Sequence, residues 1–183
     1  LLDALTIRQC KGGFRDLVVA ITGDIRHSRV ARSAHRALTT LGVAELRIAG
    51  PAEMMPEAGE FAGARRFESF DEAIAGADVV MMLRIQRERV AGVGPIDVVG
   101  YHQQFGLTAA RLARARPQAI VMHPGPMNRG VEITSDVADG PQSVIRRQVA
   151  NGVAMRMAVL AHLADARASR VASYALPTSV VRP

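Results

Sequence analysis

Short apolar runs that end abruptly in polar loops are the feature that most restricts the fold of this chain. Residues 77–82 and 119–122 are such runs, and each opens into a loop rich in charge, glycine or proline. Similar runs cover residues 17–22 and 45–49, and stretches such as residues 28–41 repeat apolar or small residues at helical spacing. Strands separated by helices of this length predict βαβ crossovers and a parallel sheet.

The expected fold is therefore an α/β, three-layer Rossmann-like domain, in which a parallel sheet carries helices on both faces. Smaller elements complete the pattern. We expect a brief strand at residues 65–67, short helices at 54–61, 70–74 and 108–115, and an irregular segment from the end of strand 77–82 to about residue 104.

The two ends of the chain depart from this alternation. Residues 1–14 contain an amphipathic helix with no capping residue before it, so we interpret the chain as a fragment. Residues 15–142 form the α/β unit. Residues 143–183 contain a long helix and a proline-containing tail, and we expect the first and last helices to lie together outside the sheet. One stripe of the long helix is apolar: Val149, Val153, Met157 and Leu160.

Composition narrows the classes of function. The chain has 183 residues, enough for one domain with a real core, and no apolar run reaches the length of a membrane span. A single cysteine, Cys10, excludes an internal disulfide or a cysteine-based zinc site and fits a reducing cytoplasm. The five histidines show no ligand-type spacing with acids, so we expect no metal.

The net charge of +6 raises the question of nucleic acid. However, Lys11 is the only lysine, and the arginines are scattered without interleaved aromatic residues. Aromatic residues make up 4% of the chain and tryptophan is absent, which leaves little to stack on bases. The sequence therefore predicts neither a nucleic-acid partner nor a membrane partner.

Arginines stand where the predicted strands end. Arg29 follows the first strand at the start of a helix, where a cation opposes the helix dipole and is unfavourable unless an anion binds nearby. Arg84 and Gln86 follow strand 77–82 and are two residues apart, so in extended chain their side chains would point to the same side. Ligands of parallel sheets bind outside the carboxyl ends of the strands, and a guanidinium matches a carboxylate in a bidentate way. We expect a shared hollow there that holds a small dicarboxylate.

The loop after strand 119–122 begins His123-Pro124-Gly125-Pro126. Its prolines remove two N–H donors and its glycine permits close approach, so the carbonyls become rigid acceptors suited to a substrate amine. His123 is interpreted as a structural histidine. No Gly-x-Gly-x-x-Gly follows Gly23-Asp24, and no nucleophile with a base is discernible, so a nicotinamide or flavin cofactor is disfavoured.

Taken together, these segments resemble the aspartate-binding domain of the aspartate carbamoyltransferase family. The resemblance runs from Leu1 to about Leu163. It rests on four motifs in family order: Gly23-Asp24-Ile25-x-x-Ser28-Arg29, Met82-x-Arg84-Ile85-Gln86-x-Glu88-Arg89, His123-Pro124-Gly125-Pro126-x-Asn128-Arg129-Gly130-x-Glu132-Ile133 and Gln148-Val149-x-Asn151-Gly152-Val153-x-x-Arg156.

The resemblance implies a role for each site residue. Arg29 and Arg84, helped by Gln86, would hold the two carboxylates of L-aspartate, and the backbone around Gly125 and Pro126 would meet carbamoyl phosphate and the attacking amine. Asp24, Glu88 and Arg89 would brace the closed form of the enzyme, and Pro124 would support the site. Arg129 would be a further candidate for substrate contact. No cofactor is implied.

The resemblance also implies what the chain lacks. The family's phosphate-gripping Ser-x-Arg-Thr-Arg and His-Pro-Thr-Gln segments belong to a first, carbamoyl-phosphate domain, and neither is present. Residues 1–14 would then lead in from that domain and residues 143–183 would pack back toward it, and we expect the chain alone to be inactive. Family members work in pyrimidine synthesis in the cytoplasm as trimers, and the sequence leaves open whether regulatory or dihydroorotase-like subunits attach.

Two alternatives remain. An ornithine carbamoyltransferase shares both domains, but it carries a cysteine in the loop where this chain has Gly125, and the cationic side chain of ornithine would clash with Arg84. A non-catalytic homologue that serves as an assembly partner is the other, and the intact Arg29, Arg84 and Gln86 argue against it.

Overall fold

A parallel sheet of five strands forms the centre of the computed structural model, which describes residues 1–85 and 97–174. The strand order is β3-β2-β1-β4-β5, and every neighbouring pair is parallel. This confirms the predicted parallel sheet, whose strands are the four apolar runs and the brief strand expected near residue 66: β1 Val18–Thr22, β2 Glu45–Ala49, β3 Ala64–Phe67, β4 Val79–Met82 and β5 Ile120–Met122.

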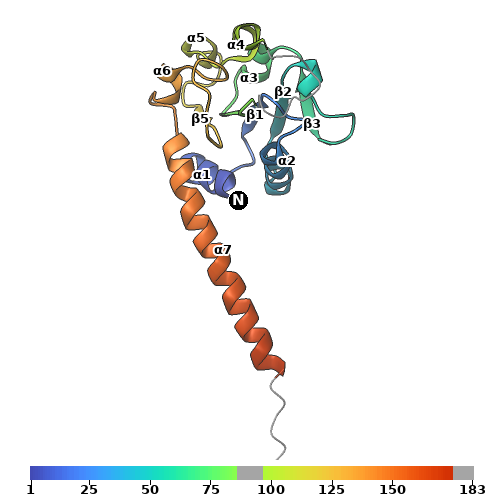
Figure 1. The fold of residues 1–183 in the computed structure, drawn as a ribbon, viewed down its shortest axis with the longest axis vertical. Coiled ribbons are helices and arrows are strands. Elements are labelled where there is room, and N and C mark those ends of the chain that lie inside the picture. The colour runs from blue at the N-terminus through green and yellow to red at the C-terminus, as the bar shows by residue number, and fades with distance from the viewer. Residues whose placement is uncertain (86–96, 175–183) are drawn as a thin grey trace, which may run out of the picture.

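Helices cover the two faces of this sheet (Figure 1). Alternate residues of one strand point to opposite faces, so Val19 and Ile21 of β1 enter one core while Ala20 between them enters the other. The first core also contains side chains of α1 (Leu2–Lys11) and α2 (Arg29–Leu41). The second contains side chains of the remaining helices: α3 Phe70–Ile74, α4 Val98–Phe105, α5 Ala109–Leu112, α6 Ser135–Ala138 and the start of α7 Ile145–Tyr174.

Three of the smaller helices differ from expectation. The predicted helix at 54–61 is wrong, since the structure has a 3-10 turn, η1, at Ala52–Met54 and then irregular chain. Pro56 and Gly59 explain the break, because each disfavours a helix interior. The helix predicted over 108–115 is the four-residue α5. The segment expected to stay irregular up to residue 104 contains α4.

α4 begins at a capped end. The side chain of Asp97 accepts a hydrogen bond from Gly100 N at 3.0 Å, the geometry of an N-cap. Tyr101 and Phe105, four residues apart, bury one side of the helix against the second core. This packing brings α4 over the carboxyl-terminal side of the sheet.

The first and last helices lie together, as the sequence predicts (Figure 1). Buried amides join them. Asn151 Nδ2 donates to Thr6 Oγ1 at 2.9 Å and to Gln9 Oε1 at 2.8 Å, and Gln148 Nε2 donates to Asp3 Oδ1 at 2.7 Å. Burial raises the pKa of Asp3, and the hydrogen bond from Gln148 opposes that shift.

Beyond these contacts α7 runs out of the body of the domain (Figure 1). Its apolar stripe lies in the open: Val149, Val153, Met157 and Leu160 are 58%, 56%, 66% and 67% exposed. Among the helices of the described residues, none has the length and apolar character needed to cross a membrane.

Candidate functional site

Three loops meet at the carboxyl-terminal edge of the sheet, after β1, β4 and β5. Leu83 N donates to Thr22 O at 2.8 Å, which joins the first two strands at their ends. Gly23 then lies so close to Leu83 that an added Cβ would sit 3.0 Å from Leu83 O. Asn128 Nδ2 donates to Ile85 O at 3.4 Å and ties the third loop to the second. The direction of strand order reverses between β1 and β4, which is where doubly wound sheets bind ligands.

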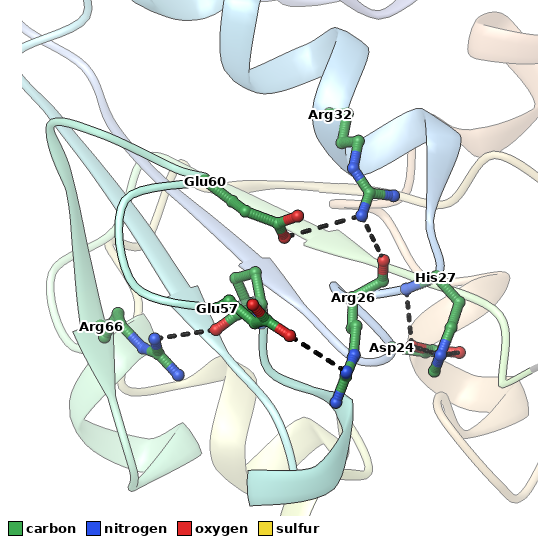
Figure 2. Close-up of polar contacts among 8 residues, drawn as sticks. Asp24, Arg26, His27, Arg32, Glu57, Glu60 and Arg66 are labelled. Atoms are coloured by element: carbon green, nitrogen blue, oxygen red, sulfur yellow. Dashed lines mark hydrogen bonds and ion pairs between the residues drawn. The ribbon is translucent and has the colours of Figure 1, made fainter.

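The loop after β1 presents Arg29 at its far end. Asp24 is 2% exposed and accepts from His27 N at 3.1 Å, while one of its oxygens lies 2.9 Å from His27 Nδ1 (Figure 2). Ser28 caps α2 by accepting from Ala31 N at 3.0 Å. Arg29 is therefore the first helical residue, and it is exposed. An anion at this helix start would offset both its charge and the helix dipole.

Other charged residues of this region are engaged in surface pairs (Figure 2). Arg26 Nη2 lies 3.4 Å from Glu57 Oε1, and Arg32 Nη2 lies 3.6 Å from Glu60 Oε2. Arg32 also donates to the carbonyl of Arg26 at 2.7 Å. These contacts fasten the irregular chain after η1 to the loop after β1.

The loop after β5 is organised around a fully buried histidine. Gly125 N donates to His123 Nδ1 at 2.9 Å, so the ring proton lies on Nε2, which is 3.2 Å from Glu132 Oε1. Asn128 N donates to the same carboxylate oxygen. Gly125 has φ +64°, a conformation that favours glycine, and the Gly125-Pro126 bond is cis. His123 thus supports the turn, in agreement with its structural interpretation.

Two buried polar atoms near this loop have no hydrogen-bond partner among the described residues: Tyr101 Oη and Glu132 Oε2. Burial raises the pKa of the Tyr101 phenol far above its usual range, and the carboxylates of Glu132 and Asp24 add to the shift. Tyr101 is therefore a neutral phenol, buried in the second core. Sequence reasoning missed Tyr101, although its spacing from Phe105 was a signal for the helix that carries it.

The predicted binding residues lie in the chain segments that follow three neighbouring strands. Arg84 follows β4 by two residues and is half-buried, Arg29 ends the adjacent loop, and Gly125 and Pro126 lie in the third loop. Pro124, between His123 and Gly125, is half-buried. The other predicted residues after β4 lie outside the described residues: Gln86, Glu88 and Arg89.

Arg129 forms an ion pair within the domain. Its guanidinium forms a bidentate pair with Asp139, with Nη–Oδ distances of 2.7 and 3.0 Å. The hydrogen bonds from Arg129 lower the pKa of Asp139. This exposed pair gives Arg129 a role in holding the chain before α6, and a substrate contact remains a prediction.

A hollow of about 910 Å³ lies beside these loops. Its walls come from Asp24 and His27, from the chain after β2, from the end of β3 and the residue after it, and from α4, including Tyr101 and Phe105. Of the predicted site residues that the structure describes, Asp24 alone lines it. This hollow is therefore not the one expected for Arg29, Arg84 and Gly125, whose shared site at the rim after β1, β4 and β5 remains a prediction.

Within residues 1–85 and 97–174 no group of three or more His, Cys, Asp or Glu side chains could hold a metal ion. The chemistry available at the rim is that of guanidinium groups, backbone carbonyls and buried amides. Such groups can bind and orient anions and can stabilise developing charge.

Comparison with known proteins identifies the kind of domain. Residues 15–163 match the family model for the aspartate/ornithine carbamoyltransferase Asp/Orn binding domain. The aspartate carbamoyltransferase catalytic subunit of Xanthomonas oryzae pv. oryzae is 57% identical over 162 residues, which are 87% of this chain and 51% of that protein. The chain thus spans about half the length of the curated relatives it matches.

Solved structures agree on the fold. Aspartate transcarbamoylase from Trypanosoma cruzi, in complex with N-(phosphonacetyl)-L-aspartic acid, matches with TM-score 0.73 and 26% identity over 87% of this chain and 53% of that one. Ornithine carbamoyltransferase from Pyrococcus furiosus matches with TM-score 0.72 and 28% identity over 87% of this chain and 53% of that one. The chain belongs to the aspartate/ornithine carbamoyltransferase family, and its residues 15–163 are the aspartate/ornithine-binding domain of that family.

Proposed function

We propose that this chain is the aspartate half of an aspartate carbamoyltransferase, which transfers the carbamoyl group of carbamoyl phosphate to the amine of L-aspartate in de novo pyrimidine biosynthesis. The observation that carries the proposal is the convergence of the three loops after β1, β4 and β5, of which the first ends at Arg29 and the second contains Arg84. The name of the 57% identical relative, and the aspartate analogue bound to the Trypanosoma cruzi enzyme, support aspartate as the ligand.

In the proposed mechanism Arg29 and Arg84, together with Gln86, hold the two carboxylates of aspartate. Bidentate guanidinium contacts fix the direction of the amine, which attacks the carbamoyl carbon. The rigid turn at Gly125 and Pro126 lies against the carbamoyl phosphate, and phosphate leaves through a tetrahedral intermediate. Catalysis comes from orientation and charge stabilisation without a covalent enzyme intermediate. Asp24, Glu88, Arg89 and Pro124 support this arrangement, and no cofactor takes part.

The proposal places this domain inside a longer protein. Residues 1–14 lead in from a carbamoyl-phosphate domain, residues 15–142 bind aspartate, and residues 143–183 pack back toward the first domain. The exposed apolar stripe of α7 supports the last point, because it offers a ready surface for such packing. The complete protein is proposed to be a cytoplasmic homotrimer, alone or with regulatory or dihydroorotase-like subunits.

A steady-state assay of two proteins tests this function. The full-length protein should form N-carbamoyl-L-aspartate from carbamoyl phosphate and L-aspartate, and it should prefer aspartate to ornithine. The 183-residue chain alone should stay at background, since it lacks the groups that grip the phosphate. A preference for ornithine would assign the other branch of the family, a full-length protein with no activity would favour an assembly role, and activity of the isolated chain would contradict the division into two halves.

A further inference from the structure

A buried glutamine connects α1 to the turn at Gly125. Gln148, in the first turn of α7, is 1% exposed and accepts from His123 N at 3.0 Å through Oε1. Through Nε2 it donates to Asp3 Oδ1 on α1 at 2.7 Å. The ring of His123 in turn accepts from Gly125 N at 2.9 Å. A continuous chain of hydrogen bonds thus runs from α1 to the turn.

Asp3 decides which way the Gln148 amide points. A carboxylate can only accept, so it selects the NH₂ end of the amide and leaves the oxygen for the backbone N–H of His123. Without Gln148 that N–H would be a buried donor with nothing to receive it, because His123 itself is 0% exposed. The start of the Pro124-Gly125-Pro126 turn is therefore fixed by a residue 25 positions further along the chain.

We propose that Gln148 is a positioning residue of the site, which sets the direction of the Pro124-Gly125-Pro126 carbonyls according to the place of α1. The inference rests on the proposed function for its catalytic readout. It adds to that function a physical link between the helix that opens the chain and the turn assigned to carbamoyl phosphate. A shift of α1 would be transmitted to the turn through Asp3 and Gln148.

The test uses the full-length protein and a matched control. Gln148→Leu removes both hydrogen bonds of the amide. Gln142→Leu makes the same change in a glutamine at the other end of β5, whose Nε2 donates to Pro117 O at 3.2 Å and to Ala119 O at 3.0 Å. We expect Gln148→Leu to lower kcat about 10-fold or more with the KM for aspartate within about threefold, and Gln142→Leu to leave kcat within about twofold.

An exchanged pair separates positioning from simple packing. Gln148→Glu should lower kcat as much as Gln148→Leu, because it puts a second carboxylate against Asp3. Adding Asp3→Asn restores one amide and one carboxylate, so Asn donates to Glu and Glu still accepts from His123 N. The double variant should recover kcat to within about threefold of the parent. Equal losses in Gln148→Leu and Gln142→Leu, or no recovery in the double variant, would overturn the proposal.

Hydrogen exchange keeps this inference separate from the proposed function. Amide exchange of the segment 121–130 should be about 10-fold faster in Gln148→Leu and unchanged in Gln142→Leu, whether or not the protein is active. If the parent protein is inactive but the two variants differ in amide exchange in this way, the proposed function is contradicted and the hydrogen-bonded connection from α1 to the turn is supported. Unchanged exchange in Gln148→Leu would sink the link, even in an active enzyme.

Discussion

At the scale of single residues, Arg84 bears the sharpest test of the site. It stands half-buried two residues past β4, beside the strand whose loop ends in Arg29. Arg84→Ala in the full-length protein should lower kcat/KM for aspartate about 100-fold, or roughly 3 kcal/mol of transition-state binding. Arg84→Lys should recover little, because an ammonium cannot form the bidentate contact. Steady-state kinetics at varied aspartate measures both.

Arg32→Ala is the matched control for this loss. Arg32 lies one turn beyond Arg29 on α2, and its guanidinium is occupied by Glu60 and by the carbonyl of Arg26. Its removal should leave kcat/KM within about threefold, since exposed ion pairs contribute little. An Arg84→Ala enzyme that behaves like Arg32→Ala would remove Arg84 from the site.

Some residues of the site could be singled out from the sequence, and others could not. Arg84 could be singled out because it follows an apolar run almost directly, and Arg29 because it begins the helix after the first strand, where a cation is unfavourable without an anion. Glu132 and Gln148 could not be assigned their roles, because their partner His123 is distant in sequence and the contacts exist only once β5, the loop and α7 are packed. The structural role of a buried polar side chain depends on such hydrogen-bond partners.

At the scale of elements, the strands were predicted more accurately than the short helices. β1, β4 and β5 are runs of apolar or β-branched residues, so their local signal is strong, while β2 and β3 also contain arginines. α4 was missed although Asp97, Tyr101 and Phe105 mark a cap and a buried stripe, because glycines and a proline precede it. The helix predicted at 54–61 failed because apolar residues there pack as irregular chain, with Met55 and Phe61 in the first core.

The joint between β2 and α3 yields a pH-dependent prediction. Arg47 Nη2 donates to Glu45 Oε2 at 2.8 Å, and its Nη1 donates to Ala75 O at 2.7 Å at the end of α3. The hydrogen bond from Arg47 lowers the pKa of Glu45 from its ordinary value. A carboxyl whose pKa is lower in the folded than in the unfolded state stabilises the fold at pH values above its unfolded-state pKa. This stabilisation is lost as the pH falls through its folded-state pKa.

Glu45→Gln should therefore destabilise the protein at pH 7 by about 0.5–1 kcal/mol, with the difference fading below about pH 4. Thermal unfolding of the full-length protein at the two pH values measures it. Glu68→Gln, an exposed glutamate after β3, serves as the control and should unfold like the parent at both. A constant difference for Glu45→Gln across this range would mean that its charge does not matter.

At the scale of the whole molecule, the apolar stripe of α7 predicts a covered surface in the complete protein. Met157 lies on the stripe at 66% exposure, and Ala158 lies about half a turn round the helix from its centre. Met157→Asp should destabilise the full-length protein by about 2–3 kcal/mol, the worth of one buried side chain, while Ala158→Asp should have little effect. Equal unfolding temperatures for the two variants would show that the stripe stays in water.

The side-by-side placement of α1 and the start of α7 has a consequence for the whole protein. The chain enters the α/β unit through α1 and leaves it through α7, and these two helices are neighbours. Both covalent connections of the unit to the rest of a longer protein would therefore lie on the same side. We expect it to rotate as one rigid body without disruption of its sheet. For the same reason the unit could be exchanged between related proteins in a chimera, with one junction before Leu2 and the other after Gly152.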